Sequence, residues 1–187
     1  MSAGTQAATR LVVLDRDGVI NRDSKDFVKS AEEWIPLDGS IEAIARLSQA
    51  GFRVAVASNQ SGISRGLFDA SALAGMHAKL HSLVADAGGR IDHIAICPHG
   101  PDEDCDCRKP KPGLLYQAAA ALDASLLDAP VIGDSLRDLQ AAQSADARPI
   151  LVRTGNGAKT ESGLVDDLSG TEVYDDLSAA VAALIAE

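Results

Sequence analysis

The sequence predicts an α/β protein with a doubly wound, mostly parallel β-sheet and helices on both of its faces. Short apolar runs with the length of buried strands alternate along the chain with segments whose apolar residues recur at helical spacing. The alternation continues from residue 10 to residue 187 without a repeat or a linker, so we expect a single domain there and a loose tail at residues 1–9. A chain of 187 residues is long enough to bury a core.

Each expected element has its own signal. Strands are expected at the short apolar runs, which in chain order are residues 11–14, 53–57, 91–96, 131–132 and 149–152. Helices are expected where apolar residues recur at spacings of three and four, namely at residues 41–50, 70–87, 112–122, 136–145 and 176–186. Capping residues 38–40 precede the first helix and Gly51 ends it. Gly88 ends the second helix, and Pro112 suits the first turn of the third.

The composition is acidic, because 27 Asp and Glu residues outnumber 17 Lys and Arg residues and give a formal net charge of −10. Charge-driven binding to nucleic acid or to an anionic membrane usually needs a basic stripe, so we expect neither partner. No apolar segment reaches the roughly 20 residues that cross a bilayer, and the first ten residues lack the pattern of a secretion signal. We therefore expect a cytoplasmic monomer that acts on a small molecule.

Polar segments follow four of the expected strands. In a parallel α/β sheet, ligands bind beyond the carboxyl ends of the strands, where the strand order reverses. Residues that follow these strands therefore have the best prospect of meeting in one site, although they are distant in sequence. The four segments are Asp15–Gly18, Ser58–Gly62, Cys97–Lys111 and Gly133–Ser135.

Asp15, Asp17 and Asp134 form the candidate magnesium site. Two carboxylates held as close as Asp15 and Asp17 repel each other unless a cation lies between them. Magnesium takes oxygen ligands and favours one or two carboxylates together with substrate phosphate oxygens. The alternative is that Asp15 and Asp17 cap a turn and that Asp134 caps a helix. We favour the metal site because the other strand ends carry groups that bind phosphate.

Two of those segments offer phosphate-binding groups. Ser58, Asn59, Gln60 and Ser61 supply hydroxyl, amide and backbone donors, although the same residues would also suit an ordinary capped turn. The segment 108–113 reads RKPKPG and is a dense basic patch whose prolines stiffen the backbone. Lysine and arginine both bind phosphoryl oxygens, and the alternative for this patch is a solvated surface turn.

Cysteine and histidine are concentrated just before the basic patch. All three cysteines lie within residues 97–107, and an odd number of closely spaced thiols does not suit a disulfide framework. Three thiolates and one imidazole can close a tetrahedral zinc site with no open position for catalysis. The alternative is a set of reduced cysteines beside a surface histidine. The expected zinc ligands are Cys97, His99, Cys105 and Cys107, and such a site would order Arg108 and Lys109, which come next in the chain.

With these residues in place, the chain resembles the haloacid dehalogenase superfamily of phosphatases. That resemblance implies a Rossmann-like sheet, and the intervals after the first two motifs are too short for the cap domain that many members insert. An open, capless site is therefore expected, walled by the zinc loop and by residues 20–34. All four superfamily motifs occur in order, at Leu11–Gly18, Val54–Ser58, Lys109–Pro112 and Gly133–Asp134.

Within the superfamily, three segments are similar to one subgroup. It contains the phosphatases of D-glycero-D-manno-heptose 1,7-bisphosphate and of histidinol phosphate, and the segments 59–62 and 108–109 resemble the heptose enzymes more closely. This implies removal of the C7 phosphate during synthesis of the heptose precursor of the lipopolysaccharide core. Histidinol phosphate is the alternative substrate, and a receiver-like phosphate-binding module is the alternative from another class of protein. The three segments are DRDGVIN at 15–21, SNQSGI at 58–63 and the block from Cys97 to Gly113.

The resemblance also implies a role for each residue. Asp15 is the nucleophile that forms an aspartyl-phosphate, and Asp17 is the general acid and base, which requires a higher pKa than that of Asp15. Magnesium is held by Asp15, Asp134 and a main-chain oxygen of Asp17, while Ser58 and Lys109 stabilise the phosphoryl oxygens. The implied substrate-binding residues are Arg16, Asp23, Ser24, Lys25, Asp26, Asn59, Gln60, Ser61 and Arg108, of which Arg108 is a candidate contact for a second phosphate.

Overall fold

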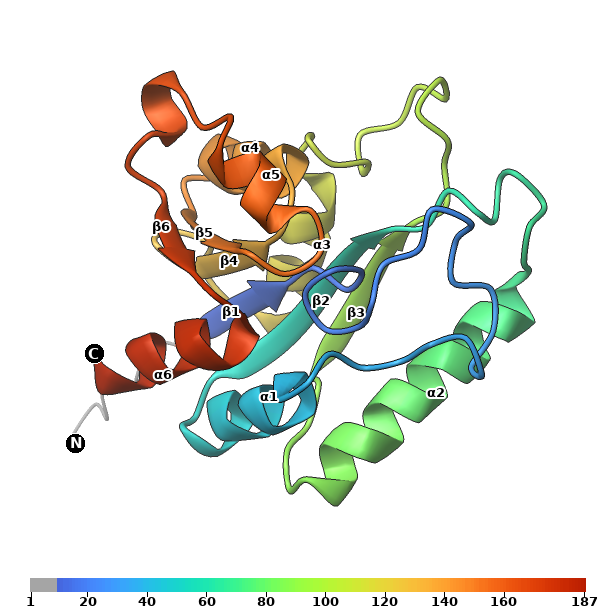
Figure 1. The fold of residues 1–187 in the computed structure, drawn as a ribbon, viewed down its shortest axis with the longest axis horizontal. Helices are drawn as coiled ribbons and strands as arrows, with labels where there is room; N and C mark the ends of the chain where they lie inside the picture. The colour runs from blue at the N-terminus through green and yellow to red at the C-terminus, as the bar shows by residue number, and fades with distance from the viewer. Residues whose placement is uncertain (1–9) are drawn as a thin grey trace, which may run out of the picture.

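A six-stranded parallel sheet lies at the centre of the protein, whose structure is a computed structural model that describes residues 10–187 (Figure 1). The expected tail at residues 1–9 lies outside the described residues. The strand order is β3-β2-β1-β4-β5-β6, and every neighbouring pair is parallel. The strands are β1 (Leu11–Leu14), β2 (Arg53–Asn59), β3 (His93–Cys97), β4 (Pro130–Gly133), β5 (Arg148–Val152) and β6 (Glu172–Tyr174).

Helices cover both faces of the sheet, as the sequence predicts (Figure 1). The apolar sides of α1, α2 and α6 pack on one face, and those of α3 and α4 pack on the other. A short helix, α5, and a 3-10 turn at Asp166–Leu168 follow β5. The α-helices are α1 (Ser40–Gln49), α2 (Ala70–Asp86), α3 (Gly113–Leu122), α4 (Leu136–Ser144), α5 (Gly157–Glu161) and α6 (Leu177–Ala186).

The buried run of β1 contributes to both cores. Val12 and Leu14 pack in the cluster under α1, α2 and α6, whereas Leu11 and Val13 pack in the cluster under α3 and α4. Successive side chains of a strand point to opposite faces, so a strand covered on both sides must be apolar throughout. This is why β1 is a continuous run of apolar residues instead of an alternation of apolar and polar ones.

The strand order locates the expected ligand site. The chain moves outward from β1 to β2 and β3, and then returns to place β4 on the other side of β1. The carboxyl ends of β1 and β4 therefore flank the point at which the order reverses, and loops diverge there to leave a crevice. The same order argues against the receiver-like alternative, because receiver domains have the order 2-1-3-4-5.

The structure differs from the predicted elements mainly at their ends and after β5. The third strand begins at His93, not at Ile91, because the Asp92 carboxylate accepts the Val54 N–H at 2.8 Å and takes the place of a strand partner. The strand β6 was not predicted, since it has only three half-buried residues and no apolar run. Among the described residues, no helix is both long and apolar enough to cross a membrane.

Candidate active site

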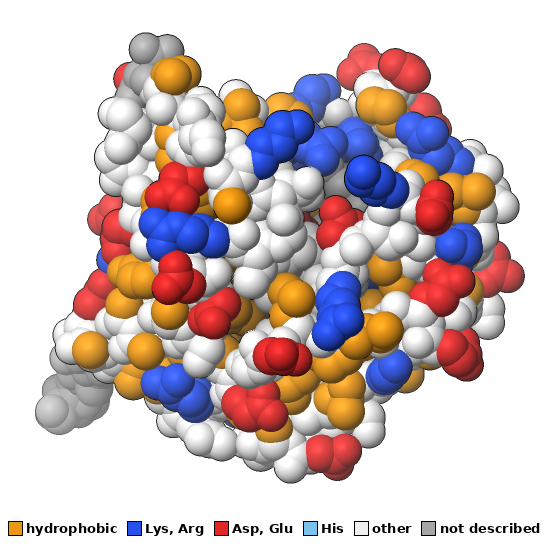
Figure 2. Space-filling view, viewed as in Figure 1, with side chains coloured by type: hydrophobic (Ala, Val, Ile, Leu, Met, Phe, Trp, Pro, Cys, Tyr) orange, Lys and Arg blue, Asp and Glu red, His pale blue; other side chains and the backbone are white. Residues whose placement is uncertain are grey.

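A cavity of about 380 Å³ opens at the carboxyl ends of β1, β2 and β4. Its size suits a small ligand. Lys and Arg side chains gather around a hollow on this face, and acidic side chains lie inside it (Figure 2). The residues that line it come from five separated parts of the chain and include Asp15, Asp17, Asp23, Ser24, Ser58, Asn59, Gln60, Ser61, Arg108, Lys109, Asp134, Asp138 and Asn156.

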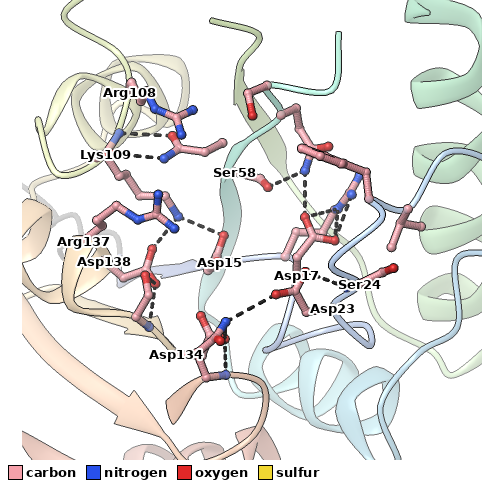
Figure 3. A pocket seen from close by; sticks show the side chains of 18 of the residues that line it. Asp15, Asp17, Asp23, Ser24, Ser58, Arg108, Lys109, Asp134, Arg137 and Asp138 are labelled. Carbon is pink, nitrogen blue, oxygen red and sulfur yellow. Dashed lines mark hydrogen bonds and ion pairs between the residues drawn. The ribbon is translucent and has the colours of Figure 1, made fainter. Parts of the chain in front are cut away.

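Lys109 lies between two carboxylates at the floor of this cavity (Figure 3). Its Nζ is 2.8 Å from Oδ1 of Asp15 and 2.6 Å from Oδ1 of Asp138, and it donates to the Ala57 carbonyl at 2.8 Å. The side-chain amide of Asn59 bonds both the N–H and the carbonyl of Lys109, each at 3.1 Å. These contacts fix the position of the ammonium and compensate its burial, since only 4% of the residue is exposed.

Asp15, Asp134 and Asp138 form an acidic cluster in which one oxygen from each side chain lies within 4.8 Å of the others. Three carboxylates and the Lys109 ammonium leave two negative charges without a partner. Carboxylate oxygens are the ligands of hard cations, so the donor set and its charge both fit a single Mg²⁺ ion. Asp138, which the sequence analysis did not include, replaces the Asp17 side chain in this cluster.

Two glycines allow the loops to close on Asp134. A Cβ atom built on Gly18 or on Gly155 would lie 2.2 Å from Oδ2 of Asp134, and both residues have positive φ angles, +86° and +58°. The Asn156 N–H donates to the same oxygen at 2.7 Å. The turn at 155–157 thus orients a carboxylate of the acidic cluster.

Burial changes the protonation of the acidic cluster. It raises the pKa of Asp15 to about 8, and the neighbouring Asp138 carboxylate acts in the same direction while Lys109 opposes it. Burial also raises the pKa of Asp134 to about 6, although hydrogen bonds from Asn156 lower it. A divalent cation favours the ionised form of its carboxylate ligands, so these raised values describe the cluster without a cation.

The Asp17 carboxylate faces away from the acidic cluster and accepts three sets of hydrogen bonds (Figure 3). Arg16 and Asn21 each donate at 2.9 Å and Gln60 donates at 2.8 Å. Burial alone would raise the pKa of Asp17, but the Arg16 guanidinium and these hydrogen bonds outweigh it and hold that pKa below its usual value. Without a cation the pKa of Asp17 is therefore below that of Asp15, which is the reverse of the order expected for the two catalytic roles.

Ser58 and Arg16 have partners within the site. Gln60 Nε2 donates to the Ser58 hydroxyl oxygen at 2.7 Å as well as to Asp17, which leaves the hydroxyl proton free to point into the cavity. Arg16 is only 1% exposed and its guanidinium is paired with Asp17. Arg16 lines the cavity, but because its guanidinium is paired with Asp17, its role is to orient that carboxylate and not to bind the substrate directly.

The structure brings most, but not all, of the predicted substrate-binding residues to the cavity. Asp23, Ser24, Asn59, Gln60, Ser61 and Arg108 line it. Lys25 and Asp26 are exposed in the same loop and do not line it. Phe27, Val28, Pro101 and Ser135 also line it, from segments that the sequence predicts at the site, whereas Arg65, Arg137, Asp138 and Asn156 lie outside those segments. Only Asp138 carried a signal, as a second aspartate four residues after Asp134.

The predicted zinc ligands also meet. Cys97, His99, Cys105 and Cys107 each offer a ligand atom within 4.8 Å of the others. His99 Nδ1 lies 3.5 Å from the Cys97 sulfur and 3.3 Å from that of Cys107, and the sulfurs of Cys97 and Cys105 are 3.8 Å apart. Distances of this size match the edges of a tetrahedron around zinc with bonds of about 2.0–2.3 Å. The residues present therefore fit a structural Zn²⁺ ion.

Comparisons with known proteins agree with this geometry. The family described as polynucleotide kinase 3 phosphatase matches residues 10–135, and the HAD-hydrolase-like family matches residues 106–180. The D-glycero-β-D-manno-heptose-1,7-bisphosphate 7-phosphatase of Pseudomonas aeruginosa is 53% identical over 94% of this chain and 97% of its own. The protein of the same name from Bordetella bronchiseptica is 52% identical over 95% and 99%.

Solved structures give the same result. The heptose bisphosphate phosphatase of B. bronchiseptica, crystallised with magnesium and phosphate, superposes with a TM-score of 0.91 at 51% identity and covers 95% of this chain and 99% of its own. The heptose bisphosphate phosphatase of Burkholderia thailandensis gives a TM-score of 0.74 at 45% identity and covers 96% and 100%. With its strand order, its Lys109-centred acidic cluster and these relatives, the chain belongs to the haloacid dehalogenase superfamily and, within it, to the family of D-glycero-β-D-manno-heptose-1,7-bisphosphate 7-phosphatases.

Proposed function

We propose that this protein is a magnesium-dependent phosphatase that removes the C7 phosphate of D-glycero-β-D-manno-heptose 1,7-bisphosphate. The observation that carries the proposal is the identity of 53% to a phosphatase of this name over nearly the whole of both chains. The contacts of Lys109 with Asp15 and Asp138 support it, because they assemble the groups that phosphoryl transfer needs. The proposal includes that the protein acts as a monomer in the cytoplasm and that its product supplies the heptose precursor of lipopolysaccharide.

Asp15 is proposed to attack the phosphorus atom and form an aspartyl-phosphate, which divides the hydrolysis into two easier displacements. When bound, Mg²⁺ at Asp15, Asp134 and the main-chain oxygen of Asp17 supplies positive charge that reduces repulsion between carboxylate and phosphate. Lys109, whose ammonium contacts Asp15, stabilises the phosphoryl oxygens, and the Ser58 hydroxyl donates a hydrogen bond to them. Asp138 keeps Lys109 charged and in place between attack and hydrolysis.

Asp17 is proposed to give a proton to the leaving sugar oxygen and later to take one from water. Its pKa is held low by Arg16 and by the hydrogen bonds of Asn21 and Gln60, so it is ionised before the substrate arrives. A doubly charged phosphate brought next to Asp17 raises that pKa, because like charges disfavour the ionised form. Substrate binding thus favours uptake of a proton from solvent by the Asp17 carboxylate, and this is the proton that the first step gives to the leaving sugar oxygen.

We propose a structural Zn²⁺ ion at Cys97, His99, Cys105 and Cys107. Burial raises the pKa of the Cys97 thiol and raises that of Cys107 to about 12, whereas hydrogen bonds outweigh burial and lower the pKa of Cys105, so Cys97 and Cys107 need an ion to hold them as thiolates. Arg108 donates to the His99 carbonyl at 3.0 Å, which ties the zinc loop to the basic patch. The ion would order Arg108 and Lys109 without taking part in the chemistry.

The alternatives have less support. The two relatives described above are named as phosphatases of heptose bisphosphate and not of histidinol phosphate. A test measures kcat/KM for phosphate release from both substrates, with Asp15→Asn beside the wild type. The proposal expects the heptose bisphosphate to be preferred by at least about tenfold and the variant to be inactive. Preference for histidinol phosphate, or stable retention of phosphate without turnover, would reject it.

A further inference from the structure

We infer that Arg137 is a specificity-determining residue that binds the second phosphate of the substrate together with Arg108. The inference rests on the proposed function, because only a bisphosphate has a second phosphate to offer. Arg137 is on the first turn of α4, three residues after Asp134, and lies outside every motif that the sequence analysis used. It lines the active-site cavity.

Arg108 and Arg137 stand at the boundary between two hollows. The first is the active-site cavity, and the second is a depression of about 510 Å³ beside residues 101–105 of the zinc loop. The two hollows share the residues Pro101, Arg108, Lys109 and Arg137. A group held at this boundary is therefore next to Lys109, where the reacting phosphate sits, but is displaced from it toward the zinc loop.

Arg137, which is exposed at the edge of the cavity, differs from the two buried cations of the site because its guanidinium is unpaired. Lys109 is bound by Asp15 and Asp138, and Arg16 is bound by Asp17. Among the side chains that the structure describes, Arg137 has no hydrogen bond or ion pair. In Figure 3 it lies with Arg108 and Lys109 on the side of the cavity away from Asp17.

Arg108 also has donors to spare. Its one hydrogen bond runs from Nη1 to the His99 carbonyl, so most of its fork of N–H groups has no partner among the described residues. Of the three acidic residues of the adjoining depression, Glu103 accepts the Gly100 N–H and Asp104 pairs with Lys111, while Asp102 is exposed, and none of them pairs with Arg108 or Arg137. The two guanidinium groups are thus available to an anion from outside the protein.

The position of Arg137 is unfavourable unless an anion binds there. The first turn of a helix is the positive end of its dipole, where cations are disfavoured, and Arg108 adds a like charge across the boundary. A phosphate dianion between the two guanidinium groups relieves both repulsions. Arginine also matches phosphate oxygens with two parallel N–H bonds, which fixes the orientation as well as the charge.

This arrangement gives the enzyme a means of choosing its substrate. With the C7 phosphate at Asp15 and Lys109, the sugar extends out of the cavity and carries its other phosphate at its opposite end. Binding of that remote phosphate at Arg108 and Arg137 positions the reacting one and raises kcat/KM. A monophosphate has the same reacting group but no partner for the two arginines.

The test compares D-glycero-β-D-manno-heptose 1,7-bisphosphate with the corresponding 7-phosphate as substrates of the full chain. The measured quantity is the ratio of the two kcat/KM values in each enzyme. For Arg137→Gln we expect this ratio to fall by about 10- to 100-fold, the size of a lost charge-assisted hydrogen bond, mainly through a higher KM for the bisphosphate. Arg137→Lys keeps the charge and should restore part of the ratio.

Arg46→Gln is the matched control, because Arg46 is an exposed arginine on the last turn of α1 that lines none of the hollows around the site. It should leave the ratio as in the wild type, and the melting temperature of each variant reports folding. An unchanged ratio in Arg137→Gln, with an active wild type that prefers the bisphosphate, overturns this inference alone. A wild type that does not hydrolyse the bisphosphate overturns the proposed function and this inference together.

Discussion

The Nζ atom of Lys109 lies 2.8 Å from Oδ1 of Asp15, although 94 residues separate the two in the sequence. Asp15 follows β1, and Lys109 lies in the loop between β3 and α3. The pair exists because β1 and β2 are neighbours in the sheet and Asn59, at the end of β2, holds the Lys109 backbone. A nucleophile and the cation that faces it are thus fixed by the sheet.

Removing the Lys109 ammonium should abolish most of the activity. In Lys109→Met, Asp15 and Asp138 lose their common partner and the transition-state charge is no longer balanced, so kcat should fall by about 10²–10³-fold. Lys111→Met is the matched control, since Lys111 is exposed and its partners, the Asp104 and Asp106 carboxylates and the Cys105 carbonyl, lie outside the active-site cavity. Steady-state phosphate release measures both, and a comparable loss in the two variants would contradict the role given to Lys109.

A methyl group on Gly155 should weaken magnesium binding. Its Cβ would lie 2.2 Å from Oδ2 of Asp134, so the carboxylate must move out of the acidic cluster. Gly51→Ala is the control, because Gly51 also has a positive φ, +87°, but no atom within 4 Å of the added Cβ. Both variants should lose about 1–2 kcal/mol of stability from backbone strain, and Gly155→Ala should lose more, because its Cβ also lies 2.6 Å from the Gly18 Cα.

The affinity for Mg²⁺ is the quantity that separates an effect on the metal site from a general loss of stability in the two glycine variants. Calorimetric titration with Mg²⁺ should show an affinity at least about tenfold lower for Gly155→Ala and unchanged for Gly51→Ala, since a displaced ligand costs more than 1.4 kcal/mol. Equal magnesium affinities in the two variants would show that the contact of Gly155 with Asp134 does not shape the metal site.

Magnesium should stabilise the protein more at pH 8 than at pH 5.5. The pKa values of Asp15 and Asp134 in the folded state, about 8 and about 6, are above their ordinary value of 3.8. The folded protein without Mg²⁺ therefore binds more protons than the unfolded chain between about pH 4 and pH 8, and its free energy of unfolding falls as pH rises through that window. Mg²⁺ competes with those protons and cancels the loss.

Thermal melting measures this linkage. The melting temperature is recorded at each pH with Mg²⁺ and without it, and no chelator is added, because a chelator would also remove zinc. The increase in melting temperature on adding Mg²⁺ should be larger at pH 8, and the apparent affinity should be at least about tenfold higher there. An increase that is equal at both pH values, or larger at pH 5.5, would show that Asp15 and Asp134 do not bind protons and metal in competition.

Much of this architecture follows from local sequence. The run at β1 predicts a strand covered on both faces, and the polar residues after β1, β2 and β4 predict the cavity, because parallel strands end at a common edge. Asp17 shows what local sequence cannot give. Its low pKa depends on Arg16 and on Gln60, which is 43 residues away in the chain, and only the folded sheet brings them together.

The remaining differences have similar physical causes. Asp138 lies on the buried side of α4, where an apolar residue is usual. It is there to pair with the Lys109 ammonium, a contact that only the folded chain brings about. The strand β6 gains its structure from pairing with β5, since its own three residues carry no apolar signal. Long-range partners decide both features.

The purified protein should contain about one equivalent of zinc. Cys105→Ser should lose it and melt at a lower temperature, because the loop of Gly, Pro and acidic residues has no core of its own. His81→Asn is the control, since His81 is exposed on α2 and is not part of the Cys and His cluster. Metal analysis and melting curves measure the effect, and thiols that titrate freely in the native, active protein would rule out the zinc site.

The most direct measurement of the central claim is the identification of the residue that carries the phosphoryl group during turnover. Wild-type protein is mixed with heptose bisphosphate and Mg²⁺, quenched in acid, reduced with borohydride and sequenced by mass spectrometry. Borohydride converts an aspartyl-phosphate to homoserine, and the account predicts that this change occurs at Asp15 and is absent from Asp15→Asn. Reduction at another residue, or full activity with no trapped residue and an active Asp15→Asn variant, would contradict it.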